Sequence, residues 1–242
     1  MWPFKKKYPL ADSGIFQGFT DWHSHILPGV DDGVRTMDEA LEILALYERL
    51  GVKTVWLTPH IMEDVPNTSA QLKARFGDLK TAYKGTIRLH LAAEYMLDNL
   101  FKQRLEENDL LPLGEKEYYL LVETSYYNPP ANLYGLLDEI KSKGYHPVLA
   151  HPERYGYMTG MGYKALKDTG VRFQLNIFSL VGAYGKEVQG KAEGLLKKGY
   201  YDLTGTDTHC KEMLRMCLAR KYTSSAIEVL LTLPTKYIFS GT

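Results

Sequence analysis

Short apolar or β-branched segments recur along this chain, and most of them end at a histidine or a carboxylate. Five such endings are TPH at 58–60, AAE at 92–94, LVET at 121–124, AHPER at 150–154 and GTDTH at 205–209. Helical patterns separate these segments. Strands that alternate with helices favour a parallel sheet with right-handed crossovers, in which the carboxyl ends of the strands share one edge. The polar residues are therefore expected to meet at that edge.

The expected elements alternate from the first strand to the last. Strands are expected at 21–25, 52–60, 87–95, 118–124, 146–151, 171–177 and 201–207, and helices at 37–50, 69–84, 133–143, 161–169 and 186–198. The first helix begins with the capping-box pattern Thr36-x-x-Glu39 and is stopped by Gly51. With about seven such units, closure into a barrel is more economical than an open sheet with two edges.

These elements predict an α/β fold, a (β/α)7 TIM-like barrel in one domain at residues 20–242. Residues 1–19 are expected to be an irregular lead-in, because Pro3, Pro9, Gly14 and Gly18 break any period. The composition of the 242 residues, 45% hydrophobic and 24% charged, is that of an ordinary globular protein.

The charge balance and the cysteines limit the partners and the compartment. The formal net charge is zero, so no basic excess attracts nucleic acid or an anionic membrane surface. The start MWPFKKKYPL has no apolar h-region behind its lysines, and no later run approaches a membrane span. Cys210 and Cys217 are too few for a disulfide scaffold. We expect a cytoplasmic protein with no bound nucleic acid and no membrane insertion.

The stretch at 20–33, TDWHSHILPGVDDG, contains a pair of histidines one residue apart. Residues i and i+2 of an extended segment project from the same face, so His23 and His25 can direct both imidazoles to one point. This spacing is typical of metal ligands, although an isolated pair is as often ordinary loop or core structure. The other histidines favour the metal interpretation, because of seven in the chain only His90 and His146 lie outside the motifs.

The candidate ligands are oxygen and nitrogen donors without a thiolate: His23, His25, Asp32, His60, Glu94, Glu123, His151, Asp207 and His209. One metal takes about four to six ligands, so this set suits two or three divalent ions that share a bridging carboxylate. Manganese, iron and zinc all fit such ligands. A multi-metal site of this kind favours phosphoester hydrolysis. Arg154 could hold two phosphate oxygens there, and its alternative role is a surface ion pair.

Spacing argues against a cysteine-dependent phosphatase. His209-Cys210 followed by Arg215 looks similar to the His-Cys-x5-Arg loop of such enzymes, but only four residues separate Cys210 from Arg215. Met216 stands where the arginine would be needed. The intervening KEML also lacks the glycines that let backbone N–H groups close around a phosphate.

Taken together, the motifs resemble those of the PHP (polymerase and histidinol phosphatase) superfamily. The matching features are D-x-H-x-H at 21–25, TPH, the carboxylate at Glu94, AHPER and D-x-H at 207–209. HSHILPGVDDG, LLVETSYYNPP, GYHPVLAHPERY and FQLNIFSLVGAYGKEV further resemble the bacterial manganese-dependent tyrosine-protein phosphatases of capsule and exopolysaccharide loci, from about residue 19 onward. This resemblance implies the distorted (β/α)7 barrel of the PHP type and manganese as the favoured metal.

The resemblance also implies roles for individual residues. One ion would be held by His23, His25, Glu94 and Asp207, a second by Glu94, Glu123 and His151, and a third by Asp32, His60 and His209. Arg154 matches the arginine that binds the substrate phosphate in the capsular branch, and Arg215 is the nearest candidate for a second one. Asp21 is expected to orient a ligand histidine.

The implied reaction is hydrolysis of phosphotyrosine by attack of a metal-bound hydroxide, with tyrosinate leaving. The implied substrate is the phosphorylated tail of a bacterial tyrosine autokinase that regulates capsule or exopolysaccharide synthesis. Two alternatives stay open: a small-molecule phosphatase such as histidinol-phosphatase, and a non-catalytic module that binds a phosphorylated tail. The 18 tyrosines, which include pairs at 118–119, 126–127 and 200–201, are expected in the core and at the rim rather than as an aromatic mouth.

Overall fold

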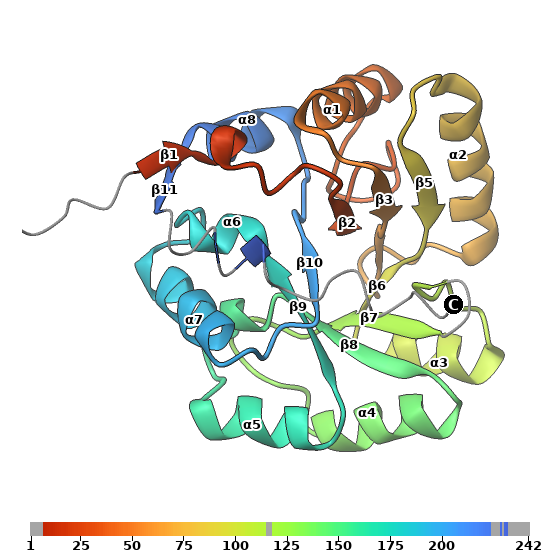
Figure 1. Ribbon diagram of the computed structural model, residues 1–242. Helices are drawn as coiled ribbons and strands as arrows, with labels where there is room; N and C mark the ends of the chain where they lie inside the picture. The colour runs from red at the N-terminus through yellow and green to blue at the C-terminus, as the bar shows by residue number, and fades with distance from the viewer. Residues whose placement is uncertain (1–6, 115–117, 224–227, 229, 232–242) are drawn as a thin grey trace, which may run out of the picture.

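The computed structural model describes residues 7–114, 118–223, 228, 230 and 231, in which parallel sheets are flanked by helices (Figure 1). One sheet has six strands in the order β10-β9-β8-β7-β6-β4, and a second has three in the order β2-β3-β5. The neighbouring strands within both sheets are parallel, as expected of the α/β class. The bounds are β2 Thr20–Ser24, β3 Thr54–Leu57, β4 His60–Ile61, β5 Arg88–Leu91, β6 Glu94–Met96, β7 Tyr119–Glu123, β8 His146–Ala150, β9 Arg172–Asn176 and β10 Leu203–Gly205.

The two sheets join because two strands are interrupted rather than ended. Thr58 and Pro59 alone separate β3 from β4, and two alanines separate β5 from β6. Proline has no N–H to give to the ladder, which accounts for the first break. On the other side of the molecule, Ser24 of β2 forms a parallel bridge with Thr208, just beyond β10. The combined sheet is therefore curled, with β2 beside β10 (Figure 1).

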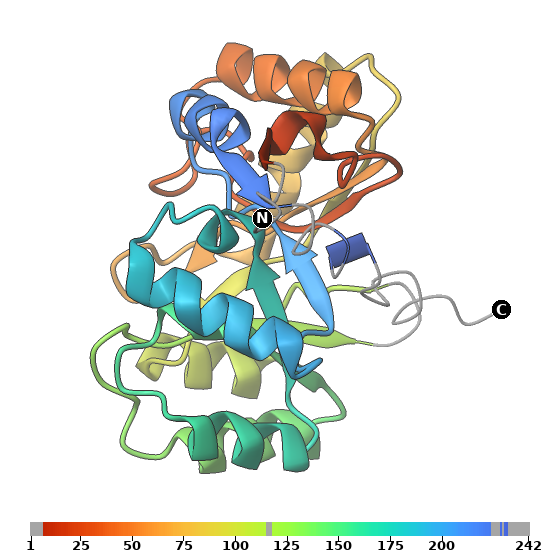
Figure 2. The same cartoon turned by 60° about the vertical axis from the view of Figure 1, so that its left-hand side comes forward.

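The helices lie around the outside of this curled sheet (Figures 1 and 2). Those predicted from the sequence are present within two residues of their expected ends: α1 Met37–Leu50, α2 Ser69–Ala82, α4 Leu133–Ser142, α5 Gly160–Asp168 and α7 Lys186–Lys197. The others are α3 Asn99–Glu107, α6 Ile177–Leu180, α8 Lys211–Ala219 and the 3-10 turn η2 Pro152–Arg154. Among the described residues, no helix combines the length and the apolar character needed to cross a bilayer.

The start of α1 carries only half of the predicted capping box. The hydroxyl of Thr36 accepts a hydrogen bond from the Glu39 N–H at 3.2 Å, as expected of an N-cap. The Glu39 carboxylate instead accepts from the N–H of Lys211, at the start of α8. One side chain therefore ties together the beginnings of two helices that lie far apart in the sequence.

The described part of the expected irregular lead-in contains two short elements. β1 Lys7–Pro9 pairs antiparallel with β11 Lys221–Thr223, and the 3-10 turn η1 Leu10–Ser13 follows it. Leu10 and Phe16 are buried in the main core. These short elements were not predicted, because a three-residue strand is too short to show a period in the sequence.

The strands enclose a second apolar cluster, which we call the inner floor: Trp22, Trp56, Ala92, Leu113, Tyr119, Leu121, Val148, Ala150 and Leu203. The indole rings of Trp22 and Trp56 stack with their centroids 5.6 Å apart. Residues an even number of positions apart along a strand share a face. The face that carries Trp56, Ala92, Leu121 and Leu203 therefore continues, at the carboxyl ends, to His60, Glu94, Glu123 and Asp207.

Candidate metal centre

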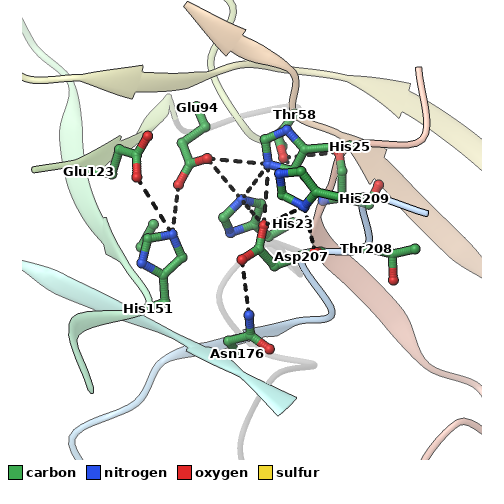
Figure 3. Close-up of polar contacts among 12 residues, drawn as sticks. His23, His25, Thr58, Glu94, Glu123, His151, Asn176, Asp207, Thr208 and His209 are labelled. Atoms are coloured by element: carbon green, nitrogen blue, oxygen red, sulfur yellow. Dashed lines mark hydrogen bonds and ion pairs between the residues drawn. The ribbon is translucent and has the colours of Figure 1, made fainter. Parts of the chain in front are cut away.

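The side chains predicted as metal ligands meet near the carboxyl ends of the strands. Figure 3 labels His23, His25, Glu94, Glu123, His151, Asp207 and His209 among them. Each belongs to at least one group of donors whose ligand atoms lie within 4.8 Å of one another. The groups are His25, Asp32, His60 and His209; His23, His25 and Asp207; His23, Glu94 and His151; and His60, Glu94 and Glu123. Since the groups overlap, the arrangement fits more than one ion.

His23 and His25 direct their Nε2 atoms toward each other, 3.0 Å apart. The Nδ1 atom of His23 donates to the side-chain oxygen of Gln174 at 2.9 Å, and that of His25 donates to Asp31 at 2.8 Å. Neutral imidazoles protonated at Nδ1 carry bare lone pairs at Nε2. Two such lone pairs repel at this distance, whereas a cation accepts both. This geometry fits a metal ion bound by both histidines.

Glu94 lies at the centre of the site and is fully buried. Its Oε2 atom lies 3.1 Å from Nε2 of His23 and 3.2 Å from Nδ1 of His60, and its Oε1 atom lies 3.1 Å from Nε2 of His151. Within the described residues, the buried atoms Oε2 of Glu94, Nδ1 of His60 and Nδ1 of His151 have no hydrogen-bond partner. Because buried polar atoms are rarely left unpaired, Glu94 Oε2 and His60 Nδ1, which face each other, suit coordination by a cation.

Asp32, His60 and His209 form the outer part of the site. Oδ1 of Asp32 lies 3.5 Å from Nε2 of both histidines, and the carboxylate side chain is 71% exposed. The neighbouring His209 imidazole lowers the pKa of Asp32 to about 2. Nδ1 of His209 is 2.9 Å from the backbone carbonyl of Asp207, which leaves its Nε2 free to bind a metal.

The carboxylates of the site crowd one another. Burial raises the pKa of Glu123 well above its ordinary value, and the nearby charges of Glu94 and Asp207 raise it further. Burial also raises the pKa of Asp207, but the neighbouring His23, His209, His151 and Arg154 outweigh it and lower this pKa below its ordinary value. Cations among these groups would relieve the repulsion that raises the pKa of Glu123.

Two residues outside the predicted set, Gln174 and Asp31, orient candidate ligands. Gln174 accepts from His23 Nδ1 and from the backbone N–H of His151, and its own amide donates to the carbonyl of Leu175. Asp31 accepts from His25 Nδ1 and from the N–H groups of Gly33 and His60.

Asp21, which was expected to orient a ligand histidine, binds the backbone rather than an imidazole. Its carboxylate accepts from the N–H groups of His23 and Thr206 and from the hydroxyls of Tyr47 and Thr206. It thereby fixes β2 against the segment that follows β10.

The backbone at the site allows β10 to lie unusually close to β2. A Cβ atom at Gly205 would lie 2.5 Å from the Cβ of His23, so only glycine lets β10 come this near to β2. His151 and Asp207 both have positive φ, at 31° and 54°. Such conformations are uncommon for residues other than glycine, and they cluster at functional sites.

Arg154 reaches the site from η2. Its NH1 atom donates to Oδ2 of Asp207 at 2.8 Å, and its side chain is 18% exposed. Arg215 is exposed on α8 and is absent from the residues that line the pocket. The structure therefore brings Arg154, but not Arg215, to the candidate metal ligands.

A pocket of about 320 Å³ opens over the ligands. It is lined by Asp32, His60, Glu94, Tyr126, His151, Arg154, Tyr184, Asp207, His209 and Met213. From the tyrosine pairs, Tyr126 lines this pocket, while Tyr119 and Tyr201 are buried in the core and Tyr127 is 81% exposed. Sequence reasoning placed such residues in the core and at the rim and did not single out Tyr126 or Tyr184.

Comparison with known proteins agrees with this geometry. Residues 19–230 match the family model described as capsular polysaccharide synthesis, CpsB/CapC. The chain is 30% identical over 196 residues to the tyrosine-protein phosphatase YwqE of Bacillus subtilis, covering 78% of this chain and 76% of YwqE. It is 28% identical over 208 residues to the tyrosine-protein phosphatase CpsB of Streptococcus pneumoniae, covering 78% of this chain and 82% of CpsB.

The fold resembles that of a solved relative. A crystal structure from work on YwqE of Bacillus subtilis and CpsB of Streptococcus pneumoniae, described as unique metal-dependent tyrosine phosphatases, matches with a TM-score of 0.76. The match covers 92% of this chain and 89% of that one, at 24% identity. With the family model matched over most of its length, the chain belongs to the CpsB/CapC family of capsular polysaccharide synthesis proteins.

Proposed function

We propose that this protein is a metal-dependent phosphatase that hydrolyses phosphotyrosine. The observation that carries the proposal is the pair of Nε2 atoms of His23 and His25, which face each other at 3.0 Å while both Nδ1 atoms are bound to acceptors. A divalent ion is the partner that suits two such lone pairs. The substrate class is supported by the family, whose members YwqE and CpsB are named tyrosine-protein phosphatases.

The proposed site holds up to three ions. His23, His25, Glu94 and Asp207 would hold one, Glu94, Glu123 and His151 a second, and Asp32, His60 and His209 a third. Manganese, iron and zinc all fit a donor set of imidazoles and carboxylates. Manganese is the favoured ion because the chain resembles the manganese-dependent phosphatases of capsule loci. When bound, such ions supply Lewis acidity toward phosphoryl oxygens and lower the pKa of water.

The chain itself contributes the phosphate-binding cation. Arg154 lies beside the ligands in the pocket and keeps its charge, because the nearby Asp207 outweighs the effect of burial and raises the pKa of the guanidinium. In the proposed reaction it binds the phosphoryl oxygens and neutralises the charge that develops on them. Tyrosinate, with a solution pKa of about 10, leaves more readily than an alkoxide, so a strong general acid is not needed.

We also propose that the curled sheet closes as the distorted (β/α)7 barrel of the PHP type. In this description β3 with β4 and β5 with β6 each count as one interrupted strand. Closure between the first and last strands is supported by the bridge of Ser24 with Thr208 and by the hydrogen bond from the Asp207 N–H to the His23 carbonyl at 2.8 Å.

The proposed substrate is the phosphotyrosine-containing tail of a bacterial tyrosine autokinase that regulates capsule or exopolysaccharide synthesis. The family description, capsular polysaccharide synthesis, supports this process. A cytoplasmic location fits both the proposed kinase tail and the two cysteines, Cys210 and Cys217, which are free thiols.

The test measures phosphate release from a phosphotyrosine peptide and from histidinol phosphate, side by side. Metal-stripped protein is assayed after separate addition of manganese, zinc or ferrous iron, with a chelator as the control. We expect manganese-dependent release from the peptide and little from histidinol phosphate. Release from histidinol phosphate alone would leave the site but change the substrate class, and release from neither compound with any metal would contradict an enzymatic function.

A further inference from the structure

The guanidinium of Arg154 lies between two tyrosine rings. Its central carbon is 4.4 Å from the ring centroid of Tyr126 and 4.4 Å from that of Tyr184. Tyr126 follows β7 and Tyr184 follows α6, so the two rings come from loops far apart in the sequence. A cation placed over an aromatic face is attracted by the ring quadrupole, and a planar guanidinium can use both of its faces in this way. The rings therefore fix the plane of the guanidinium.

The edge of the same guanidinium is held at one point only. Within the described residues, its hydrogen-bond partner is Oδ2 of Asp207, which NH1 reaches at 2.8 Å. A guanidinium has five N–H donors in a fixed fork, so the remaining donors are available to an anion in the plane. Arg154 lines the pocket above the candidate metal ligands, so these donors lie beside the space that a phosphoryl group would enter.

Asn176 links one of the rings to the same carboxylate. Its Nδ2 atom donates to the hydroxyl of Tyr184 and to Oδ2 of Asp207, both at 3.0 Å. Oδ2 of Asp207 thus accepts hydrogen bonds from Arg154 and Asn176. Its Oδ1 atom lies 3.5 Å from Nε2 of His23 and 3.4 Å from Nε2 of His25. The position of the arginine is thereby coupled to the position of a proposed metal ligand.

We propose that Tyr126 and Tyr184 are positioning residues for Arg154, which hold its guanidinium plane so that the free edge binds the phosphoryl group of the substrate. This inference rests on the proposed phosphatase function. The two tyrosine rings then act on the phosphoryl group through Arg154, and they do not bind the aromatic ring of the substrate.

The packing of Tyr126 supports this assignment. One of its faces is covered by Arg154, and its ring also stacks on that of Tyr155, with centroids 6.1 Å apart and planes inclined by 27°. Tyr155 in turn stacks on Tyr157 at 5.6 Å. A ring already packed in such a column offers its edge, rather than a face, to a substrate phenyl group.

The experiment measures kcat/KM on a phosphotyrosine peptide for Tyr126→Leu and Tyr184→Leu, in the manganese-loaded protein. Loss of either ring is expected to lower kcat/KM about tenfold, because one desolvated cation–aromatic contact is lost. Tyr126→Phe and Tyr184→Phe keep the ring and should stay within about threefold of the wild type. Tyr127→Leu, at the exposed neighbouring tyrosine outside the pocket, is the matched control and should leave kcat/KM unchanged.

A double-mutant cycle with Arg154→Met tests whether the rings act through the arginine. Methionine keeps bulk between the rings and removes the charge. In this background, Tyr126→Leu should change kcat/KM by less than about twofold, because the group that the ring positions is gone. If the tenfold loss persists, the ring acts independently of Arg154 and the inference is wrong.

Inhibition by inorganic phosphate distinguishes binding of the phosphoryl group from binding of the aromatic ring of the substrate. Its inhibition constant should rise at least about threefold in Tyr126→Leu and Tyr184→Leu if the rings position the phosphate-binding group. An unchanged inhibition constant beside a weakened peptide reaction would instead show that the rings contact the substrate phenyl group, and would overturn the inference. Absence of turnover in the wild-type protein would contradict the proposed function itself, which is a different outcome.

Discussion

The two ends of the same strands are built in opposite ways. At the inner floor, strand residues such as Trp22, Trp56 and Leu121 are buried together in an apolar cluster. A few residues further along the same strands, the side chains that share this interior are histidines and carboxylates, and some of their buried atoms have no hydrogen-bond partner in the described part of the chain.

This contrast teaches that the two ends obtain their stability from different sources. The floor is stabilised by burial of apolar area, which needs no ligand. The site above it concentrates like charges and bare lone pairs, which a bound cation would satisfy. We therefore expect changes in the floor to affect folding and changes in the site to affect metal binding and turnover.

The largest expected effect is on turnover. His151→Ala and Asp207→Ala should each lower phosphatase activity at least about a thousandfold, because each removes a proposed ligand of a shared metal site. Folding, followed by circular dichroism, should survive both changes. The control is His146→Ala, at an exposed histidine outside the site. Wild-type activity in either ligand variant would refute the division between floor and site.

The next effect is on stability, at the floor. Trp56→Ala should lower the free energy of unfolding by about 3–5 kcal/mol, because it leaves a cavity in a packed apolar cluster. Trp56 is 5% exposed and stacks on both Trp22 and His90. Denaturant unfolding of the metal-free protein measures the change.

Adding metal to Trp56→Ala tests whether the inner floor and the metal site are independent of each other. Manganese at about 100 times its dissociation constant should stabilise the wild-type protein and Trp56→Ala alike, by about 2.7 kcal/mol for each ion bound. An altered gain in Trp56→Ala would show that the floor shapes the metal site after all, and that the two ends of the strands are not independent.

The smallest expected effect comes from a residue that would act on the metal only through a candidate ligand. Asp31→Ala should weaken metal binding about 10–100-fold, because the His25 imidazole loses the acceptor that orients it. The Asp31 carboxylate accepts from His25 Nδ1 at 2.8 Å. Isothermal titration of the metal-free protein measures the affinity, with Asp64→Ala at an exposed aspartate as the control. Equal affinities in the two variants would count against an orienting role for Asp31.

Most of the predicted ligands could be found in the sequence because they lie in or just after short apolar segments. A residue type that differs sharply from the apolar run before it, such as Glu94 after its alanines, is visible to local pattern reasoning. These signals depend only on neighbouring residues.

The orienting residues were missed because their partners are distant in the sequence. Gln174 binds His23 across 151 residues, and Tyr184 meets Arg154 only after the loops have folded together. A signal did exist for Gln174 and Asn176, which are polar residues two positions apart in an otherwise apolar strand. Tyr126 and Tyr184 gave none, because tyrosines at a rim are common.

The site can form only after β10 has been synthesised and has packed against β2 at Gly205. Asp21 in β2 binds the Thr206 N–H across 185 residues, so the first and last strands complete the same structure. During synthesis, the histidines of the first strand emerge long before Asp207 and His209. A growing chain therefore cannot complete the candidate ligand set until the segment with Asp207 and His209 has been made and has packed against β2.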